Sequence, residues 1–168
     1  MTFLAVSTEA HIEMVEALAR EIWTEHYTPI IGSGQVAYML DRFQSRQAIA
    51  AQIRSGVLYF LMQDTGGPIG YLAVQPKGEE LFLSKIYVAS SLRLKGHGRR
   101  AIEFIESLAR ARGSRKIVLT VNKNNRKAIA AYERMGFKRA KEVVQDIGSG
   151  FVMDDYQMEK TLEPREEA

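Results

Sequence analysis

Apolar residues follow two different spacings along the chain. From Ile12 to Ile22 they recur at steps of three and four residues, which place side chains on one face of a helix. Thr8 and Glu9 stand just before this run, where a helix is expected to begin. The same spacing over Val36–Ile53 predicts a second helical stretch, either continuous or divided into two helices near Ser45. The N-terminal third is therefore predicted to be mainly helical.

From Gly56 onward, short apolar runs replace the helical spacing. Val57–Met62 and Pro68–Val74 flank the turn sequence Asp64-Thr65-Gly66-Gly67, which predicts a β-hairpin. Glu80–Val88 is apolar on both faces at its centre, as expected of a buried central strand. The remaining predicted strands are Thr2–Val6, Arg115–Asn122, Phe137–Val144 and Phe151–Met158, and the remaining predicted helices are Gly98–Arg112 and Asn125–Met135. This order gives a three-stranded meander, a strand–helix–strand crossover, and then a helix and a hairpin.

Length and composition indicate one ordinary globular domain. The chain has 168 residues, of which 46% are hydrophobic and 26% charged, so it can bury one core but not two. We expect this domain over residues 1–162, followed by an acidic, frayed tail at 163–168. The absence of cysteine excludes disulfides, thiolate metal sites and a cysteine acyl intermediate, and we expect no metal.

Charge and hydropathy limit the partners that the chain can have. The net charge is +3, with much of the basic surplus between Arg93 and Arg139. This surplus suits a phosphate-bearing small molecule and is too weak to indicate nucleic acid. The first ten residues lack the basic and apolar regions of a leader peptide, and no stretch approaches the ~18 apolar residues of a membrane span. We expect a cytoplasmic protein without nucleic-acid or membrane partners.

The segment Arg93-Leu94-Lys95-Gly96-His97-Gly98 leads from the central strand into a helix. Glycines let the backbone approach a ligand closely, and the first amides of a helix attract anions. Three interpretations compete: a simple turn with a solvated basic face, a dinucleotide site, and a loop for the pyrophosphate of coenzyme A. Gly96-x-Gly98-x-x-Ala101 fits the dinucleotide pattern, but that site also needs an acid ~20 residues later. The matching strand tip, Val121-Asn122-Lys123, has none.

A second motif, Asn125-x-x-Ala128-Ile129-x-x-Tyr132-Glu133-x-x-Gly136-Phe137, spans a predicted helix. Asn125 and Tyr132 share one face of this helix. In the simplest interpretation Asn125 caps the helix, Tyr132 packs against the core and Gly136 ends the helix. The alternative is that both side chains face a ligand.

Together the two motifs resemble the GNAT superfamily of N-acetyltransferases. Arg93–Gly98 matches the Arg/Gln-x-x-Gly-x-Gly/Ala loop of that family, and Asn125–Phe137 matches its Asn-x-x-Ala-x-x-x-Tyr-x-x-x-Gly-Phe segment. The resemblance covers Val57 to Met158. It implies an α/β (α+β) fold with a mixed, mostly antiparallel central sheet of about seven strands, a central splay, and about four flanking helices. The N-terminal pattern and Met153–Tyr156 are also somewhat similar to bacterial spermidine/spermine N-acetyltransferases.

The resemblance implies acetyl-CoA as the cosubstrate. In the family, the strand that matches Glu80–Val88 pairs with the pantetheine arm much as it would with an added strand. The loop and helix start after it bind the pyrophosphate, and Asn125 reaches a pantetheine amide. The residues implied to bind the cosubstrate are Ile86, Tyr87, Val88, Arg93, Leu94, Lys95, Gly96, His97, Gly98, Arg99 and Asn125.

The chain has no cysteine, and Gly-x-Ser-x-Gly is absent, so direct transfer in a ternary complex is the natural route. The resemblance makes Tyr132 the general acid that protonates the departing thiolate, and an amide near Val88 is assigned to the oxyanion. Family members often carry a glutamate where this chain has Phe82. Glu80 is the nearest acid and is our candidate base, and a solvated acid at a strand edge is the alternative.

The acceptor is expected to be a small-molecule or peptide amine. In the family its site is formed by the N-terminal helices and the last hairpin, and the candidate residues here are Trp23, His26, Tyr27, Asp154 and Asp155. Acids beside aromatic rings can hold a cationic amine, whereas core packing and a solvated turn are the alternatives. A non-catalytic module that binds acyl-CoA is the alternative function. A homodimer formed through the last strands is a further expectation.

Overall fold

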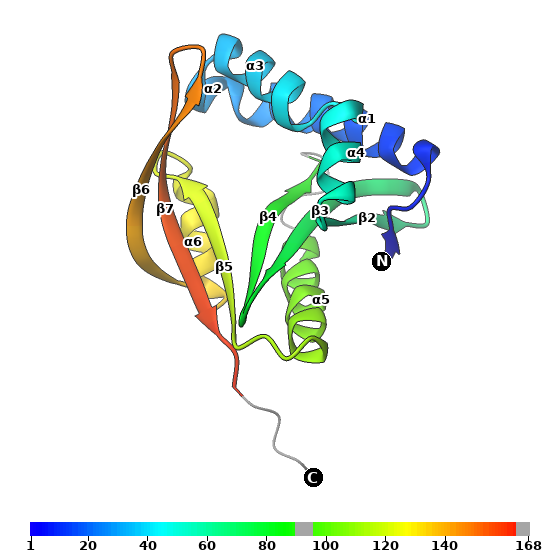
Figure 1. Ribbon diagram of the computed structural model, residues 1–168, viewed down its shortest axis with the longest axis vertical. Coiled ribbons are helices and arrows are strands. Elements are labelled where there is room, and N and C mark those ends of the chain that lie inside the picture. The colour runs from blue at the N-terminus through cyan, green and yellow to red at the C-terminus, as the bar shows by residue number, and fades with distance from the viewer. Residues whose placement is uncertain (90–95, 164–168) are drawn as a thin grey trace. The chain divides into compact units, whose positions relative to one another are not determined.

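The computed structural model describes residues 1–89 and 96–163 and contains a sheet of seven strands (Figure 1). The strand order is β1-β2-β3-β4-β5-β7-β6. The pairs β1–β2, β2–β3, β5–β7 and β6–β7 are antiparallel, whereas β4 and β5 run parallel. The strands are β1 (Thr2–Ala5), β2 (Leu58–Asp64), β3 (Gly67–Lys77), β4 (Glu80–Val88), β5 (Lys116–Asn122), β6 (Lys138–Gly148) and β7 (Phe151–Thr161). The predicted meander, crossover and final hairpin are confirmed.

The described residues form six helices, whereas the pattern predicts four, or five if the second stretch is divided near Ser45. They are α1 (Glu9–His26), α2 (Thr28–Ile31), α3 (Ser33–Phe43), α4 (Arg46–Arg54), α5 (His97–Ala111) and α6 (Arg126–Arg134). The additional helices lie in the N-terminal part, because Gly32 adopts a φ of 88° and separates the single turn of α2 from α3. Ser45 caps α4 by accepting a hydrogen bond from the Ala48 amide at 3.2 Å, which confirms the division near this residue.

The chain forms two compact units. The first contains Met1–Gln75 and Lys85–Ala101, and the second contains Pro76–Ser84 and the chain from Ile102 onward. Strand β4 contributes to both units, because its first five residues belong to the second unit and its last four to the first.

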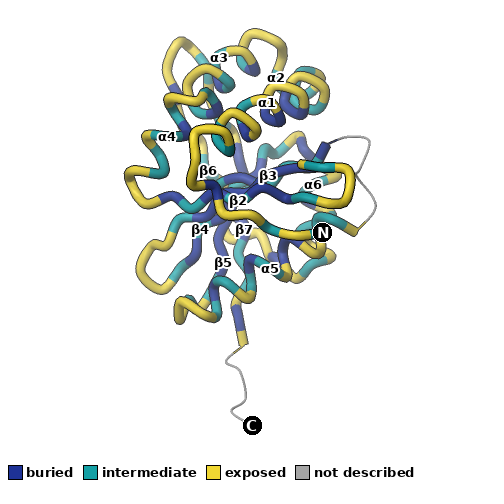
Figure 2. Tube along the Cα trace, turned by 90° about the vertical axis from the view of Figure 1, so that its right-hand side faces the viewer, coloured by how far each residue is buried: buried dark blue, intermediate teal, exposed yellow. Residues whose placement is uncertain are grey.

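In the first unit, helices α1, α3 and α4 pack on one face of the strands. Six consecutive residues of β3, Ile69–Val74, are buried, and Figure 2 shows this stretch in dark blue. The hydroxyl of Tyr71, on β3, donates a hydrogen bond to Gln44 Oε1 at 2.8 Å at the end of α3. The Trp23 ring of α1 lies 5.4 Å from that of Tyr87 on β4. These contacts hold the N-terminal helices against β3 and the second half of β4.

Lys85, on β4, is buried beneath the same helices. Its ammonium donates hydrogen bonds to the carbonyl of Phe43 at 2.8 Å, to Gln52 Oε1 at 2.9 Å and to the Tyr59 hydroxyl. Burial lowers the pKa of Lys85 to about 7 and raises that of the Tyr59 phenol. No carboxylate lies within ion-pair distance of Lys85 in the described ranges. Its charge is therefore stabilised by three neutral acceptors and not by a counter-ion.

Gly70, on β3, allows β4 to approach closely. A Cβ atom at this position would overlap the Tyr87 carbonyl oxygen and lie 3.1 Å from Val88 Cα. The neighbouring Ile69 carbonyl accepts a hydrogen bond from the Ala89 amide at 2.9 Å. Because the nearest of these atoms is a backbone oxygen of β4, with Met62 Cε at 2.9 Å as well, a side chain here would displace β4.

In the second unit, the strands have one apolar and one polar face. Ile117, Leu119 and Val121 of β5 are buried, and Lys160, which pairs with Ile117, forms an ion pair with Glu106 of α5. Helix α5 therefore covers this apolar face. The alternate residues of β5 and β7 form the polar face, which carries Lys116, Thr120, Asn122, Asp155, Gln157 and Glu159.

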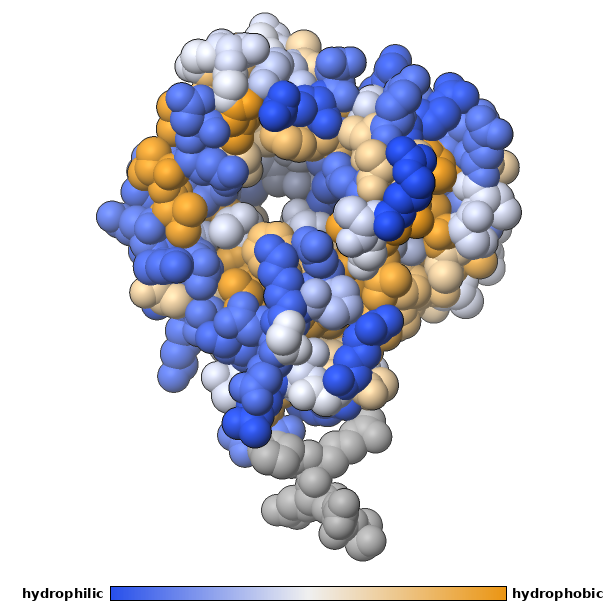
Figure 3. Space-filling view, viewed as in Figure 1, coloured by the Kyte–Doolittle hydropathy of each residue, from blue (hydrophilic) through white to orange (hydrophobic). Residues whose placement is uncertain are grey.

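Strand β5 extends beyond its ladder with β4. Glu80–Leu83 pair with Lys116–Leu119, and β5 continues for three residues to Asn122, which pair with β7. On the β6–β7 hairpin, Val144 and Val152 are 68% and 47% exposed, and Figure 3 shows hydrophobic surface over this hairpin. Over the described ranges, every helix is too short or too polar to cross a membrane.

Gly70→Ala should lower the free energy of unfolding by about 2–3 kcal/mol, because the added methyl would overlap the backbone of β4. Chemical denaturation measures this change. Gly66→Ala is the matched control, since its Cβ would meet only Asp64 Oδ1 at 3.4 Å, and its effect should stay within about 0.5 kcal/mol. Equal effects of the two substitutions would show that Gly70 does not position β4.

The stability of the protein should rise with pH above 7 because of Lys85. The unfolded state holds the Lys85 proton up to a pKa near 10.5, whereas the folded state releases it near 7, so the unfolded state binds more protons between these values. Denaturation at pH 7, 8 and 9 should give a slope up to ~1.4 kcal/mol per pH unit larger for the natural chain than for Lys85→Met. Identical slopes would contradict the lowered pKa.

Candidate functional site

The predicted site residues are divided between the two units. Strand residues Ile86–Val88, the start of α5 and the aromatic residues of α1 belong to the first unit. Glu80, Asn125, Tyr132, Asp154 and Asp155 belong to the second. Arg93, Leu94 and Lys95 lie outside the described residues.

The start of α5 is suited to an anion. Gly96 adopts a φ of 79°, which favours glycine, and its carbonyl accepts the first described helical hydrogen bond, from the Arg100 amide at 3.2 Å. The amides of His97, Gly98 and Arg99 precede that bond and have no partner within the helix. Nδ1 of His97 is buried, and no described residue hydrogen-bonds to it. These groups fit the pyrophosphate of coenzyme A.

Gly98 is less constrained than the motif predicts. It does not have a positive φ, and a Cβ atom added there would meet no described atom within 4 Å. The described residues therefore do not require glycine at this position.

Asn125 caps α6 and still has a free donor. Its Oδ1 accepts a hydrogen bond from the Ala128 amide at 3.4 Å, and the residue is only 4% exposed. Among the described residues, no acceptor pairs with its Nδ2 group. The cap and the ligand contact are therefore compatible, because they use different atoms of one side chain.

Tyr132 lies on α6 and is half-buried. Its ring packs edge-on against Phe137, with 5.7 Å between the ring centroids, and its carbonyl accepts a hydrogen bond from the Phe137 amide at 3.0 Å. The residues that end the helix thus fix the direction of the tyrosine ring.

The aromatic candidates of α1 belong to a larger cluster in the first unit. Tyr27 lies 4.5 Å from Trp23, 4.7 Å from His26 and 5.9 Å from Tyr87 between ring centroids. The Tyr71 ring belongs to the same cluster, because its centroid lies 5.3 Å from that of Tyr87. Burial raises the pKa of the Tyr71 phenol well above the ordinary value. The side chains of Tyr71 and Tyr87 were not predicted as part of this cluster. Both tyrosines stand in predicted strands that follow each other in the meander, and this is the signal in the sequence that could have indicated the cluster.

Two of the acidic candidates are engaged in ion pairs. Glu80 Oε1 lies 3.2 Å from Lys116 Nζ, and Asp154 Oδ1 lies 2.7 Å from Lys123 Nζ. The hydrogen bond that Lys123 donates to Asp154 raises the pKa of Lys123, and the bond that Lys116 donates to Glu80 raises that of Lys116. Lys123 also lies 3.5 Å from Glu142 and over the ring of Tyr156. The ion pair with Lys116 favours the interpretation of Glu80 as a solvated acid at a strand edge, and the pair with Lys123 leaves one oxygen of Asp154 for a substrate.

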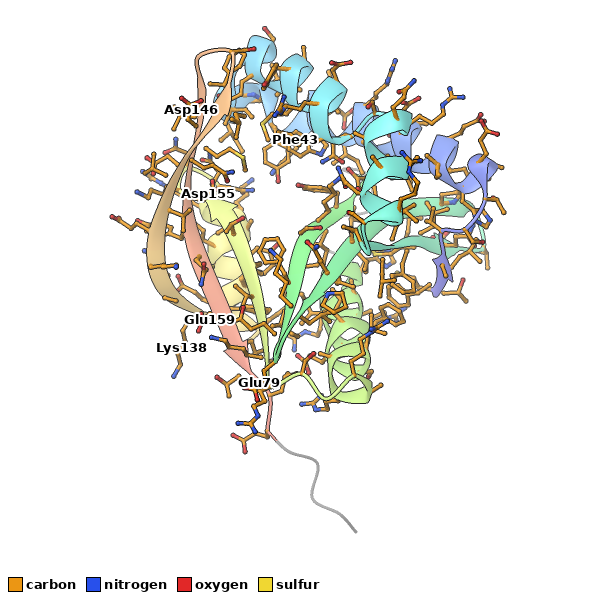
Figure 4. The ribbon with its side chains drawn as sticks, viewed as in Figure 1. Phe43, Glu79, Lys138, Asp146, Asp155 and Glu159 are labelled. Carbon is orange, nitrogen blue, oxygen red and sulfur yellow. The ribbon has the colours of Figure 1, made fainter. Side chains whose placement is uncertain are left out.

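Asp155 is buried, whereas its neighbour Asp154 is exposed and paired with Lys123. It is 5% exposed and lies on the polar face of β7, opposite Asn122 of β5 and Val143 of β6 (Figure 4). Burial, with a smaller effect of Asp154, raises the pKa of Asp155 to about 6, although the charge of Lys123 acts in the opposite direction. No described residue donates a hydrogen bond to its carboxylate or forms an ion pair with it.

The described residues contain no cluster of three or more His, Asp or Glu side chains that could hold a metal ion. The first unit instead offers the amides at the start of α5 and a cluster of aromatic rings, which suit the binding of a phosphate-bearing molecule and an amine.

The family model described as the acetyltransferase (GNAT) family matches residues 15–137. No curated protein matches the chain. The fold is similar to that of PaiA N-acetyltransferase from Thermoplasma acidophilum, solved with coenzyme A, at 19% identity and a TM-score of 0.77 over 96% of this chain and 100% of that one. A ribosomal-protein-alanine N-acetyltransferase from Escherichia coli is 20% identical, with a TM-score of 0.72 over 95% and 92% of the two chains.

A chimeric spermidine N-acetyltransferase SpeG from Vibrio cholerae is 19% identical, with a TM-score of 0.70 over 95% of this chain and 94% of that one. At these identities the three structures show a shared fold. The family model covers most of the chain, including the start of α5 and the whole of α6. The chain therefore belongs to the acetyltransferase (GNAT) family, whose acetyl donor is acetyl-CoA.

Proposed function

We propose that this protein transfers the acetyl group of acetyl-CoA directly to a primary amine, with both substrates bound at once. The observation that carries the proposal is the start of α5 after the left-handed Gly96, where the first amides have no partner within the helix. Helix α6, capped by Asn125 and carrying Tyr132, supports the proposal separately. The chain has no cysteine to form a thioester, which favours direct transfer.

Acetyl-CoA is proposed to be bound mainly through backbone groups. The amides of Gly96–Arg99 would bind the pyrophosphate, together with Arg93, Leu94 and Lys95. The backbone of Ile86–Val88 would pair with the pantetheine arm, and Nδ2 of Asn125 would donate to one of its carbonyls. The close contact at Gly70 supports this role, because it holds Tyr87 and Val88 in place.

Tyr132 is proposed to be the general acid. When the C–S bond breaks, its hydroxyl donates a proton to the departing thiolate, and a neutral phenol is suited to this step at neutral pH. An amide near Val88 would stabilise the oxyanion that forms at the acetyl carbonyl. Both groups act on charge that develops in the transition state, so they should affect kcat more than binding.

The aromatic cluster around Trp23, His26 and Tyr27 is proposed to receive the acceptor. Its rings offer faces that attract an amine cation. Because SpeG acts on spermidine, polyamines are the first acceptors to test, beside alkylamines, amino sugars and peptide N-termini. Incubation with acetyl-CoA and this panel, followed by mass spectrometry, should show an acceptor heavier by one acetyl group. If every member of the panel stays unmodified while CoA is released only by hydrolysis, amine transfer is wrong.

Tyr132→Phe should lower kcat by roughly 10²–10⁴-fold, with little change in the affinity for acetyl-CoA, because only the proton donor is lost. Steady-state kinetics and calorimetric titration measure the two quantities. Tyr38→Phe, which removes a hydroxyl from a half-buried tyrosine of α3, is the matched control and should keep kcat within about threefold. An unchanged kcat in Tyr132→Phe would exclude this tyrosine as the acid.

A further inference from the structure

Lys85 is a buried ammonium group that the hydrogen bonds around it do not require. The Phe43 carbonyl also accepts a hydrogen bond from Gln52 Nε2 at 3.0 Å, and Gln52 Oε1 also accepts one from the Tyr59 hydroxyl at 2.6 Å. Each acceptor of Lys85 therefore keeps a second partner. An apolar side chain of similar length would leave none of these groups unpaired and would avoid the cost of burying a charge. The stability of the fold alone therefore does not explain a lysine at this position.

The same groups can hold Lys85 with or without its proton. The ammonium has three N–H donors, which match the three acceptors. The neutral amine has two donors and one lone pair. Its donors can stay on the Phe43 carbonyl and Gln52 Oε1, while the lone pair accepts a hydrogen bond from the Tyr59 hydroxyl once that hydroxyl rotates. Lys85 can therefore lose its proton without a movement of the backbone.

At neutral pH, Lys85 is close to the point at which it loses this proton. Burial lowers its pKa to about 7, so about half of the molecules carry the charge at pH 7. The Nζ atom lies 4.9 Å from the centroid of the Tyr59 ring, a contact that favours the charged form. Because the two forms are so evenly balanced, a second positive charge nearby would shift Lys85 toward the neutral amine.

Lys85 adjoins the aromatic cluster within the first unit. Lys85 and Tyr87 are two residues apart on β4, a separation of about 7 Å along a strand. The Tyr87 ring packs against that of Tyr71. The Tyr71 hydroxyl donates a hydrogen bond to Gln44, which follows Phe43 in the chain, and Gln44 is buried. A cation on these rings would thus act on the Lys85 charge through a packed interior of low dielectric.

The titratable groups around Lys85 do not neutralise its charge. The phenols of Tyr59 on β2 and Tyr71 on β3 stay neutral, because burial raises the pKa of both. Helices α3 and α4 contact Lys85 through neutral groups. The other titratable members of the cluster are His26, Tyr27 and Tyr87. The charged side chains of α3 and α4, and the α1 acids near them, are exposed or paired with one another: Asp41, Arg42, Arg46, Arg54, Glu13 and Glu16.

We propose that Lys85 couples acceptor binding to pH: it gives its proton to solvent when a protonated alkylamine binds to the aromatic cluster. This inference rests on the proposed function, because it takes the cluster as the acceptor site. Of the two ammonium groups, Lys85 is the one that loses its proton, since its pKa is about 7 and that of a free alkylamine is near 10.4. Lys85 is thus a specificity-determining residue, which disfavours cationic acceptors at acidic pH.

The affinity for an alkylamine should follow the protonation of Lys85. Below pH 7 the bound cation must displace the Lys85 proton, whereas above about pH 8 there is no proton left to displace. If the second charge lowers the pKa of Lys85 by one unit or more, the Kd should fall by about five- to tenfold between pH 6 and 8.

Calorimetric titration of the full chain with the best alkylamine from the panel tests this coupling. Repeating the titration at pH 7 in buffers of different ionisation enthalpy counts the protons released. We expect about half a proton per bound amine, because about half of the Lys85 groups are charged before binding. An aromatic amine, which is neutral at pH 7, should bind without proton release and with the same Kd from pH 6 to 8.

Lys85→Met removes the charge and keeps the length of the side chain. This variant should release no proton, and its Kd for the alkylamine should change by less than about twofold between pH 6 and 8. At pH 6 it should bind the alkylamine about five- to tenfold more tightly than the natural chain does. A residue that only supports the fold would not give tighter binding when it is replaced. His26 is retained in the variant, so a pH dependence that comes from His26 would persist.

Lys138→Met is the matched control. Lys138 lies on β6 and is exposed, and Figure 4 shows it together with Phe43, whose carbonyl binds Lys85. The same chemical change there should leave the proton release at about half a proton and the Kd within about twofold of the natural value at every pH.

Thermal unfolding shows whether Lys85→Met keeps its fold. At pH 7 the variant should have a Tm equal to or above that of the natural chain, because each neighbouring group keeps a hydrogen bond. If the variant does not fold, the proton release of the natural chain with charged and neutral amines still decides the question.

The outcomes separate the two proposals. If the natural chain acetylates alkylamines but releases no proton on binding them, the role of Lys85 is wrong and the proposed function stands. A proton release or a pH-dependent Kd that persists in Lys85→Met would also overturn it. If no amine is bound or acetylated, the proposed function fails and this inference fails with it. Proton release that needs both Lys85 and a cationic amine supports the inference.

Discussion

The contact between Gly70 and the backbone of Tyr87 is the constraint on which the rest of the structure depends. It brings β3 within a distance of β4 that no other residue type allows, and so fixes the second half of β4. The Lys85 hydrogen bonds to Phe43, Gln52 and Tyr59 tie the same part of β4 to the N-terminal helices. The strand that is proposed to bind pantetheine is therefore held from two sides before any ligand arrives, which reduces the entropy lost on binding.

Lys85 and Asp155 are the buried charged residues of the described chain, and their surroundings differ. Lys85 has a full set of acceptors, so its burial is compensated within the fold, although its charge is partly suppressed. Asp155 is also buried, and burial raises its pKa to about 6, so its charge is partly suppressed as well. Sites that bind or react commonly retain such unfavourable groups, since a residue optimised for stability would have no affinity left for the substrate.

Local patterns predicted the elements well, because short-range rules determine them. The bounds of β4, Glu80–Val88, agree with the expectation, and both Thr8 and Asn125 form the expected N-caps. The single-turn α2 was missed, because its break depends on the conformation of Gly32.

The sites were harder to predict, because their partners come from distant segments. Lys85 meets Phe43 and Gln52, which lie more than thirty residues earlier, and nothing in its own strand indicates that it is buried. In the sequence Asp154 and Asp155 look alike, and only the strand register gives Asp154 an ion pair with Lys123 and buries Asp155. The family motifs, in contrast, placed Tyr132 and the start of α5 on the elements where the structure has them.

Thermal unfolding with acetyl-CoA, free CoA and NADH tests the central claim most directly, because it asks whether the start of α5 and strand β4 bind coenzyme A. A ligand at 100 times its Kd adds roughly 2.7 kcal/mol to the stability of the folded state, which raises Tm by roughly 5–10 °C for a chain of this size. We expect this rise with acetyl-CoA and CoA and none with NADH. A rise with NADH alone, or with none of the three, would contradict the assignment of these elements to acetyl-CoA.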